Sequence, residues 1–220
     1  MPRWDLLGEL SDDDQRRVIA SARRRTYARG EVVFHRGDPA DTLHLVHTGR
    51  FAVRVTTPVG QVATFAIHGP GEAFGEQALV TPGGHRSATV SALEAGETRA
   101  LYVDDFNALR RAHPEVGEAL IRLLAERIAR LSDRLLETLY ASASTRVLNC
   151  LRDLAGDPAA RAPATVAIPL TQDDLAGLAG TTRITVNRVL QREKARGAVA
   201  IERGRITVDP ARLRPQRRFD

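Results

Sequence analysis

The chain has 220 residues, 43% of them hydrophobic and 27% charged, as in an ordinary globular protein of one or two domains. No apolar run approaches the roughly 20 residues of a membrane span, and the opening MPRWDLLGELSDDDQRR lacks a signal-peptide layout, so we expect a cytoplasmic protein. The single cysteine, Cys150, excludes an intrachain disulfide and a cysteine-based zinc or iron–sulfur site. The net charge of +5 permits an acidic partner without naming one.

The first half of the chain predicts a helical start followed by strands. We expect residues 5–25 to be helical, with Ser11 as an N-cap before an acidic first turn. From about residue 30 to 103, short runs of alternating apolar and polar residues are separated by Gly, Pro or Asp turns. The runs are EVVFHRG, TLHLVHTG, RFAVRVTT, QVATFAI, SATVSAL and TRALYV. This spacing predicts a small antiparallel β-barrel or sandwich.

Residues 71–92, GEAFGEQALVTPGGHRSATVSA, place one acidic and one basic residue in a glycine-rich frame. Glu76 and Arg86 are open to three interpretations: a salt bridge to each other, an enzyme's acid–base pair, or the two ends of an anion pocket. The acid–base pair is disfavoured because an arginine stays charged. The chain also lacks HExxH, a Walker loop, G-x-S-x-G and a dinucleotide fingerprint. We therefore do not expect an enzyme.

The period changes to a helical one in residues 104–142, which hold only one glycine, Gly117, and whose one proline, Pro114, sits where a long helix would start. Six residues recur at steps of three and four, the spacing of a coiled-coil seam: Ile121, Leu124, Ile128, Leu131, Leu135 and Thr138. A second apolar edge lies beside them: Val116, Leu120, Leu123 and Leu139. One edge is expected to pack on the β-domain and the other to meet a second copy in a homodimer. The alternative is a helix that lays both edges on its own domain.

The C-terminal third predicts a helix-turn-helix with a wing. After a helix at 145–154, a loop at 156–165 and a short strand, LTQDDLAGLAGTTRITVNRVLQREKARGAV has the layout of two helices around a tight turn. Thr171 suits the first N-cap, Gly180 the turn, and Thr181 or Thr182 the second N-cap. The apolar residues of the second helix that are available for packing are Val189, Leu190 and either Ile184 or Val186. GAVAIERGRITVDP then indicates a two-stranded wing that turns at Arg203-Gly204, and the last residues, 214–220, are expected to be frayed.

The second of these helices carries side chains suited to DNA. Residues 183–205 hold seven Lys/Arg against two Glu. Arginine often makes a bidentate contact to guanine, and Lys194 and Arg196 suit phosphates. The candidate DNA contacts are Thr171, Gln172, Thr182, Arg183, Thr185, Asn187, Arg188 and Lys194. The alternatives are a solvated basic face and a helical hairpin of some other small domain.

Together these features resemble the CRP/FNR family of transcription regulators over nearly the whole chain. ARGEVVFHRGDPADTLHLVHTGRFAVRV resembles the opening of a cyclic-nucleotide-binding barrel, FGEQALV…HRSATVSA the family's phosphate-binding cassette, and TRITVNRVLQREKARG its recognition helix. The resemblance implies an α+β fold with a jelly-roll antiparallel β-barrel at 1–112. A dimerisation helix and hinge would follow at 113–143, and a winged helix-turn-helix domain at 144–220.

The resemblance also implies a cyclic-nucleotide site in the cassette. Arg86 and Ser87 would bind the cyclic phosphate, and the Glu76 carboxylate would accept a hydrogen bond from the ribose 2′-hydroxyl. Backbone amides would add N–H donors for the anion. The implied cassette contacts are Gly75, Glu76, Gln77, Ala78, Arg86 and Ser87.

Two further features of the sequence bear on which base the effector carries. The family's cyclic-AMP-responsive members supply a Thr-Ser pair to the adenine, and the matching positions here are Leu131 and Ser132; Leu131 departs from the pattern because it cannot hydrogen-bond a purine. Ser87 rather than Thr favours cyclic AMP over cyclic GMP. We expect no prosthetic group and cyclic AMP as effector, with cyclic GMP or no effector as alternatives. A haem sensor would need axial ligands, for which His68 and His85 are the nearest candidates.

The implied function is a homodimeric, ligand-gated regulator of a pseudo-palindromic site in double-stranded DNA, with RNA polymerase as a further partner. The alternative is a CRP/FNR-type regulator that is ligand-independent or uses another ligand, with the barrel as a scaffold only. Ile184 stands where the best-known members carry Glu. Because Ile cannot accept a hydrogen bond from cytosine N4, the operator should differ from the usual half-site at that base pair.

Overall fold

The chain folds into two compact units. The first comprises Met1–Val55 with Ala66–Ala129, and the second comprises Thr56–Phe65 with Arg130–Asp220. A computed structural model describes residues 4–8, 10–58, 60, 62–81, 83–156 and 165–213. Within these ranges, no helix combines the length and apolar character needed to cross a membrane.

Two antiparallel four-stranded sheets contain the strands of the N-terminal half of the chain. One has the order β1 (Arg23–Tyr27), β8 (Gly96–Tyr102), β3 (Thr42–Thr48), β6 (Ala73–Phe74). The other has the order β2 (Val32–Phe34), β7 (Thr89–Ala92), β4 (Phe51–Thr56), β5 (Val62–His68). Phe51, Phe74 and Val90, drawn from both sheets, share one buried core. The predicted α+β fold is confirmed, with a jelly-roll arrangement of two sheets that are not closed into a single barrel.

The N-terminal region departs from the predicted helix at 5–25. A short 3-10 helix, η1 (Asp5–Leu7), precedes α1 (Asp12–Ser21), whose N-cap Ser11 accepts a hydrogen bond from the Asp14 N–H at 3.2 Å, as predicted. The prediction of helix for residues 23–25 is wrong, because these residues begin β1 and pair antiparallel with β8. Pairing with β8 satisfies the backbone groups on one side of this edge strand, even though the side chains of residues 23–25 are exposed. The two-residue strand β6 was also not predicted.

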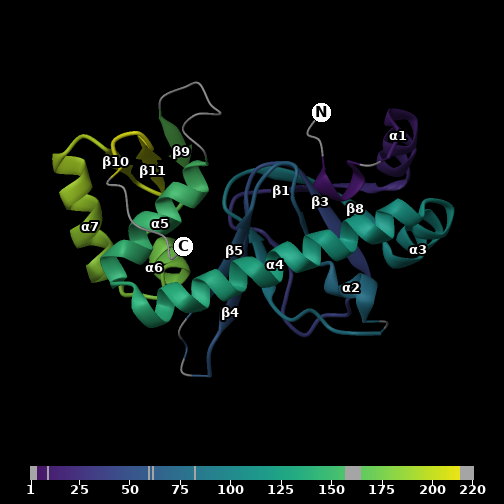
Figure 1. The fold of residues 1–220 in the computed structure, drawn as a ribbon, viewed down its shortest axis with the longest axis horizontal. Coiled ribbons are helices and arrows are strands. Elements are labelled where there is room, and N and C mark those ends of the chain that lie inside the picture. Colours follow the sequence, from purple (N-terminus) through teal and green to yellow (C-terminus); the bar gives the residue numbers. More distant parts are fainter. Residues whose placement is uncertain are drawn as a thin grey trace. The chain divides into compact units, whose positions relative to one another are not determined.

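A second core joins the N-terminal segment to the helices that follow the sheets. Trp4 and Leu7 pack with Phe106 of α3 (Val103–Ala112) and with Val116 and Leu120 of α4 (Pro114–Tyr140). The Trp4 indole N–H donates to the Val46 carbonyl of β3 at 2.8 Å. α4 starts at the predicted proline and runs as one unbroken helix (Figure 1).

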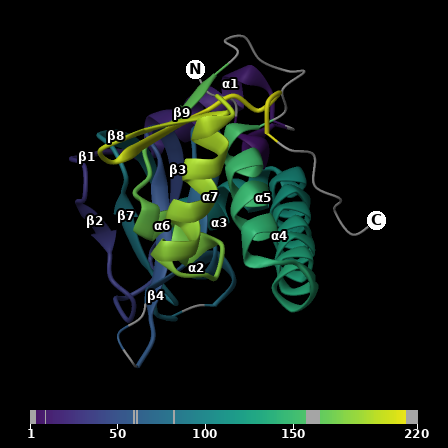
Figure 2. The same ribbon diagram turned by 90° about the vertical axis from the view of Figure 1, so that its left-hand side faces the viewer.

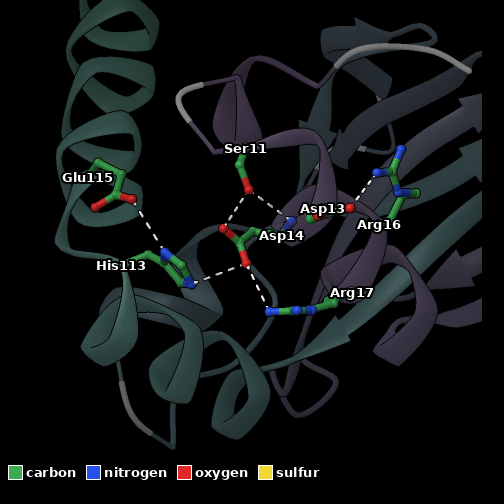
Figure 3. A network of polar contacts seen from close by, with 7 residues as sticks. All are labelled: Ser11, Asp13, Asp14, Arg16, Arg17, His113 and Glu115. Atoms are coloured by element: carbon green, nitrogen blue, oxygen red, sulfur yellow. Dashed lines mark hydrogen bonds and ion pairs between the residues drawn. The ribbon is translucent and has the colours of Figure 1, made fainter.

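Polar contacts fasten α1 to the junction of α3 and α4. His113 lies at the break between these two helices, and Figure 3 shows it between two carboxylates. Its Nε2 is 3.8 Å from Asp14 Oδ1 and its Nδ1 is 3.4 Å from Glu115 Oε1. Arg17 reaches the same Asp14 carboxylate at 3.4 Å, and Arg16 pairs with Asp13 on the same helix.

The two apolar edges of α4 differ in burial. On one edge Val116 and Leu120 are buried and Leu123 is half-buried, while Leu139 is exposed. On the predicted seam Leu124 packs against the core of the first unit. The remaining large seam residues are 58–67% exposed: Ile121, Ile128, Leu131 and Leu135.

The second unit contains the predicted helix-turn-helix and wing. α5 (Ala143–Ala155), α6 (Gln172–Leu178) and α7 (Arg183–Ala195) gather beside a three-stranded sheet (Figure 2). That sheet has the order β10 (Val199–Glu202), β11 (Arg205–Val208), β9 (Val166–Ile168). Glu202 pairs with Arg205, so the wing turns at the predicted Arg203-Gly204. Most of the predicted loop at 156–165 and the predicted frayed end at 214–220 lie outside the described residues.

Candidate functional site

The predicted cassette begins at a glycine that the local geometry requires. Gly75 follows β6 with a φ of 84°, a conformation that residues with a Cβ rarely adopt. A Cβ at Gly75 would lie 2.7 Å from Nη1 of Arg86 and 3.0 Å from the Thr42 carbonyl oxygen. Glycine is therefore needed both for the turn and for the close approach of the arginine. Glu76 follows directly and precedes the short helix α2 (Gln77–Val80).

Arg86 is buried and held from several sides. It is 6% exposed, and it donates to the Thr42 carbonyl at 2.8 Å and to the Thr42 hydroxyl at 2.7 Å. A longer bond of 3.4 Å reaches the Gly75 carbonyl. Asp41 lies 3.6 Å from its Nη2, and the guanidinium carbon is 4.1 Å from the centre of the Phe34 ring. Contacts within the protein thus fix the orientation of the guanidinium.

The electrostatics of Arg86 are those of a charge taken out of water. Burial lowers the pKa of the Arg86 guanidinium, and the Asp41, Asp38 and Glu76 carboxylates act against that shift. Its Nε–H is buried and finds no hydrogen-bond acceptor among the described residues. A buried N–H without an acceptor costs roughly 1–3 kcal/mol. An anion at Nε would recover that free energy.

The Glu76 carboxylate does not pair with Arg86, so the interpretation of a simple salt bridge between them is wrong. It forms an ion pair with Arg127 of α4, which also donates to the Ala73 carbonyl. Sequence reasoning missed Arg127. Its only signal was its position one helical turn before Leu131 on the long helix.

A histidine behind the arginine completes a buried polar chain. His44 is 6% exposed, with Nε2 3.3 Å from the Thr42 hydroxyl and Nδ1 3.1 Å from the Thr98 hydroxyl. Burial, with the charges of Arg86 and Arg25 as smaller causes, lowers the pKa of His44 to about 3. The ring is therefore neutral at neutral pH. The Thr42 hydroxyl that accepts from Arg86 is in turn positioned by this neutral ring.

The other predicted ligand residues are less constrained. Gln77 and Ser87 are exposed. The Ala78 N–H already donates to the Gly75 carbonyl at 3.1 Å, so the N–H groups of residues 75–77 are the predicted anion donors that remain. Leu131 and Ser132 lie on the part of α4 that belongs to the second unit, and their contact with a ligand stays a prediction.

Two threonine caps set the ends of the helix-turn-helix. Thr171 caps α6 in a reciprocal capping box with Asp174, and Thr182, not Thr181, caps α7 by accepting from the Thr185 N–H. Gly180 has a φ of 56° at the turn between them. Arg146 of α5 donates to the Gly180 carbonyl at 2.9 Å and so holds this turn from outside.

α7 presents a polar face around one apolar residue. Its buried residues are Val186, Val189, Leu190 and Glu193. Of the two candidates for packing, Val186 is buried and Ile184 is 73% exposed. Arg183, Asn187, Arg188 and Lys194 are exposed as well.

The predicted DNA contacts at the start of α7 touch side chains of α6. Arg183 lies 3.6 Å from the Asp173 carboxylate, both side chains being exposed. The Asn187 side-chain amide donates to Gln172 at 3.3 Å. The two helices thus hold these polar groups on one surface, and their contact with DNA stays a prediction.

The residues considered for haem ligation lie in unlike surroundings. His68 is buried with its ring 6.1 Å from that of Phe74 and its Nδ1 3.7 Å from Glu72. His85 is exposed and forms an isolated bridge with Pro39. Across the described part of the chain, no group of three or more His, Cys, Asp or Glu is arranged to hold a metal ion.

A buried arginine cassette in a jelly-roll unit and a winged helix-turn-helix define a class of protein that joins a small-molecule module to a DNA-binding module. Sequence comparison agrees: a cyclic nucleotide-binding domain matches residues 24–113 and a Crp-like helix-turn-helix domain matches residues 124–215. The chain belongs to the CRP/FNR family of transcription regulators, which is not a family of enzymes.

Individual relatives span most of the chain. It is 36% identical over 205 residues to the cyclic AMP receptor protein of Thermus thermophilus, covering 93% of this chain and 92% of that protein. It is 32% identical over 181 residues to a CRP-like cAMP-activated global transcriptional regulator of Mycobacterium tuberculosis, covering 80% and 79%. The crystal structure of the Thermus thermophilus catabolite activator protein has a TM-score of 0.57 at 33% identity, with 95% of each chain covered.

Proposed function

We propose that this protein is a homodimeric transcription regulator whose DNA binding is controlled by a cyclic nucleotide, with cyclic AMP as the effector. It would act in the cytoplasm on a pseudo-palindromic operator, with RNA polymerase as a further partner. The ligand half of this proposal rests above all on Arg86, which is buried, charged and left with an Nε–H that has no acceptor among the described residues.

The cassette suits both ends of a cyclic nucleotide. A phosphate oxygen at Arg86 would neutralise a buried charge and accept charge-assisted hydrogen bonds. The exposed Ser87 hydroxyl and the amides of residues 75–77 are further donors. Glu76, held by Arg127, is the acceptor for the ribose 2′-hydroxyl. A plain anion site would not need this second, acidic end.

The choice of cyclic AMP draws on the relatives and on the cassette. The names of the Thermus and Mycobacterium relatives state that those proteins respond to cyclic AMP, and Ser87 favours the same nucleotide. Leu131 argues the other way, because its side chain is 58% exposed and cannot hydrogen-bond a base. It favours the second candidate, a regulator of this family with another ligand or none.

The exposed seam of α4 supports the homodimer. Ile121, Ile128, Leu131 and Leu135 are each more than half exposed and recur at heptad spacing. Pairing two such helices would remove this apolar surface from water. In the DNA-competent dimer the two α7 helices should be separated by about 34 Å, so that both enter successive major grooves.

Control by the nucleotide follows from differential binding. The ligand shifts the equilibrium between competent and incompetent arrangements only as far as it binds one of them better. Ser132 and Leu131 follow Arg127 by about one turn of α4, so one helix carries the partner of Glu76 and the predicted base contacts. That helix is the element on which ligand binding would act.

Titration calorimetry tests the ligand half. The intact protein should bind cyclic AMP more tightly than cyclic GMP, and Arg86→Ala should weaken cyclic AMP binding at least about 100-fold, since two charge-assisted bonds are lost. Arg86→Lys, which keeps the positive charge but cannot make the bidentate hydrogen bonds of a guanidinium, should also bind poorly. Arg16→Ala on α1 is the control and should bind normally. If neither nucleotide gives a heat of binding at sub-millimolar concentration while the protein still binds DNA, the second candidate is favoured.

A further inference from the structure

The start of α7 carries an apolar side chain at the centre of its outward face. Successive residues of an α-helix are rotated by about 100°. Ile184, Arg188, Gln191 and Ala195 therefore form one exposed stripe, diametrically opposite the buried stripe of Val186, Val189, Leu190 and Glu193. Arg183 and Thr185 lie to either side of the exposed stripe. Ile184 is thus the most central residue in the first turn of the outward face.

Ile184 contributes little to the stability of its own unit. It is 73% exposed, the largest exposed fraction among the exposed large hydrophobic residues of the described part of the chain. Its neighbours on the outward surface are polar or basic: Arg183, Asn187, Arg188 and Gln191. The surface around it therefore suits a polyanion, and its one apolar point needs an apolar group on that polyanion.

Only one base offers such a group in the major groove. The edges of guanine, adenine and cytosine present hydrogen-bond donors and acceptors, whereas thymine adds a C5-methyl group. An isoleucine placed against the other edges would desolvate polar atoms without giving them partners. Against thymine it removes apolar surface on both sides from water.

We propose that Ile184 reads a thymine methyl in each half-site of the operator. This inference rests on the proposed function, since it needs α7 in the major groove. The thymine lies beside the base pairs read by Arg183 and Arg188, the two arginines that flank Ile184 on the helix surface. Ile184 is then a specificity-determining residue, and the half-site carries T·A at the position where a Glu would select cytosine.

Replacing thymine by uracil tests this inference, because the exchange removes only the methyl group. Unbiased selection of DNA bound by the intact protein, with and without cyclic AMP, first defines the half-site. Each thymine is then replaced singly by uracil and the affinity measured. One position should lose about four-fold in affinity per half-site, the value of one buried methyl group. The other positions serve as internal controls.

Two variants connect that methyl group to Ile184. Ile184→Ala should bind the thymine and uracil sites equally well, and its melting temperature should stay unchanged because the residue is exposed. Ile184→Glu should shift the selected base at that position to cytosine. Arg183→Ala is the matched control: it should weaken binding but keep the preference for thymine over uracil.

The outcomes separate this inference from the proposed function. If sequences are selected but no thymine responds to loss of its methyl group, or if Ile184→Ala still discriminates, the role of Ile184 is overturned and the DNA-binding function stands. If no sequence is selected in either condition, the proposed DNA-binding function fails, and the inference fails with it.

Discussion

Two arginines, one in each unit and each at a proposed binding site, differ in how firmly the fold holds them. The Arg86 side chain is 4% exposed, and two hydrogen bonds to Thr42 fix its orientation. The Arg183 side chain is 67% exposed and has a 3.6 Å ion pair to an equally exposed Asp173. The fold fixes the orientation of the Arg86 guanidinium, whereas it leaves the Arg183 side chain exposed to solvent. Substitution of Arg86 should therefore affect stability as well as binding, whereas substitution of Arg183 itself should affect binding alone.

The largest expected effect concerns His44, which lies behind Arg86. Its pKa is about 3 in the fold against the ordinary histidine value of 6.5 in an unfolded chain, so the unfolded state binds the extra proton. Above pH 6.5 the His44 ring is neutral in both states, so the free energy of unfolding keeps its full value there. It decreases as the pH falls from 6.5 towards 3, because only the unfolded state takes up the proton. By about pH 4 the loss should reach roughly 3 kcal/mol. The free energy of unfolding, measured with urea across this pH range, should depend less on pH in His44→Gln than in the parent protein. If it changed with pH equally in both proteins, His44 would not be the group responsible.

Gly75→Ala should disturb the same region at any pH. The new Cβ would sit on a backbone of positive φ and only 2.7 Å from Nη1 of Arg86. Together these two effects should reduce stability by roughly 2 kcal/mol and weaken nucleotide binding. Gly30→Ala is the matched control, because Gly30 has a φ of 83° but a Cβ added there would meet nothing within 4 Å. It should lose stability only. Equal nucleotide affinities for the two variants would show that Gly75 does not position Arg86.

On the DNA side, Arg183→Ala should leave the melting temperature unchanged. It should relax sequence choice by roughly 1–3 kcal/mol at one base pair, because the proposed bidentate contact to guanine would be lost. Binding measured on a set of singly substituted operators separates this outcome from its rival. A uniform loss on all sequences would make Arg183 a phosphate contact.

Thr182→Ala sharpens the comparison within the second unit. Thr182 is exposed but caps α7 through the Thr185 N–H, so its loss should cost about 1 kcal/mol of stability. Thr182→Ser should keep the cap and most of the stability. Thermal unfolding of the three proteins measures the difference, and a loss as large in the serine variant would argue against capping.

The smallest effect on stability is expected for His113, whose polar contacts in the first unit are open to solvent. His113 lies 3.8 Å from Asp14 and 3.4 Å from Glu115 (Figure 3), yet even a charged pair with access to solvent contributes less than about 1 kcal/mol. His113→Gln should therefore change the unfolding free energy by less than that amount. A larger loss would mean that this network fixes α1 more firmly than its exposure indicates.

Local signals were readable from the sequence because they act over a few residues. The caps Ser11 and Thr171, the turn glycine Gly180 and the proline that starts α4 each follow from the chemistry of a single turn, whereas the sequence left the cap of α7 open between Thr181 and Thr182. Gly75 and Arg86 could also be placed in one cassette from the sequence motif.

Features that depend on tertiary placement were not readable. The pair of Glu76 with Arg127 joins residues 51 positions apart and exists only because α4 passes the cassette. The strand β1 forms because β8 offers it a partner, against the helical appearance of residues 23–25. The choice between Ile184 and Val186 needed the rotational phase of α7, which a start uncertain by one residue leaves undetermined.

Trp4 gives the protein a built-in optical reporter. It is the only tryptophan of the chain, it is 1% exposed, and its indole is bonded to β3 within the first unit. Tryptophan fluorescence should therefore follow the melting of that unit alone, while far-ultraviolet circular dichroism follows the helices of both. Recording the two signals on one sample would reveal whether the first and second units unfold in a single transition.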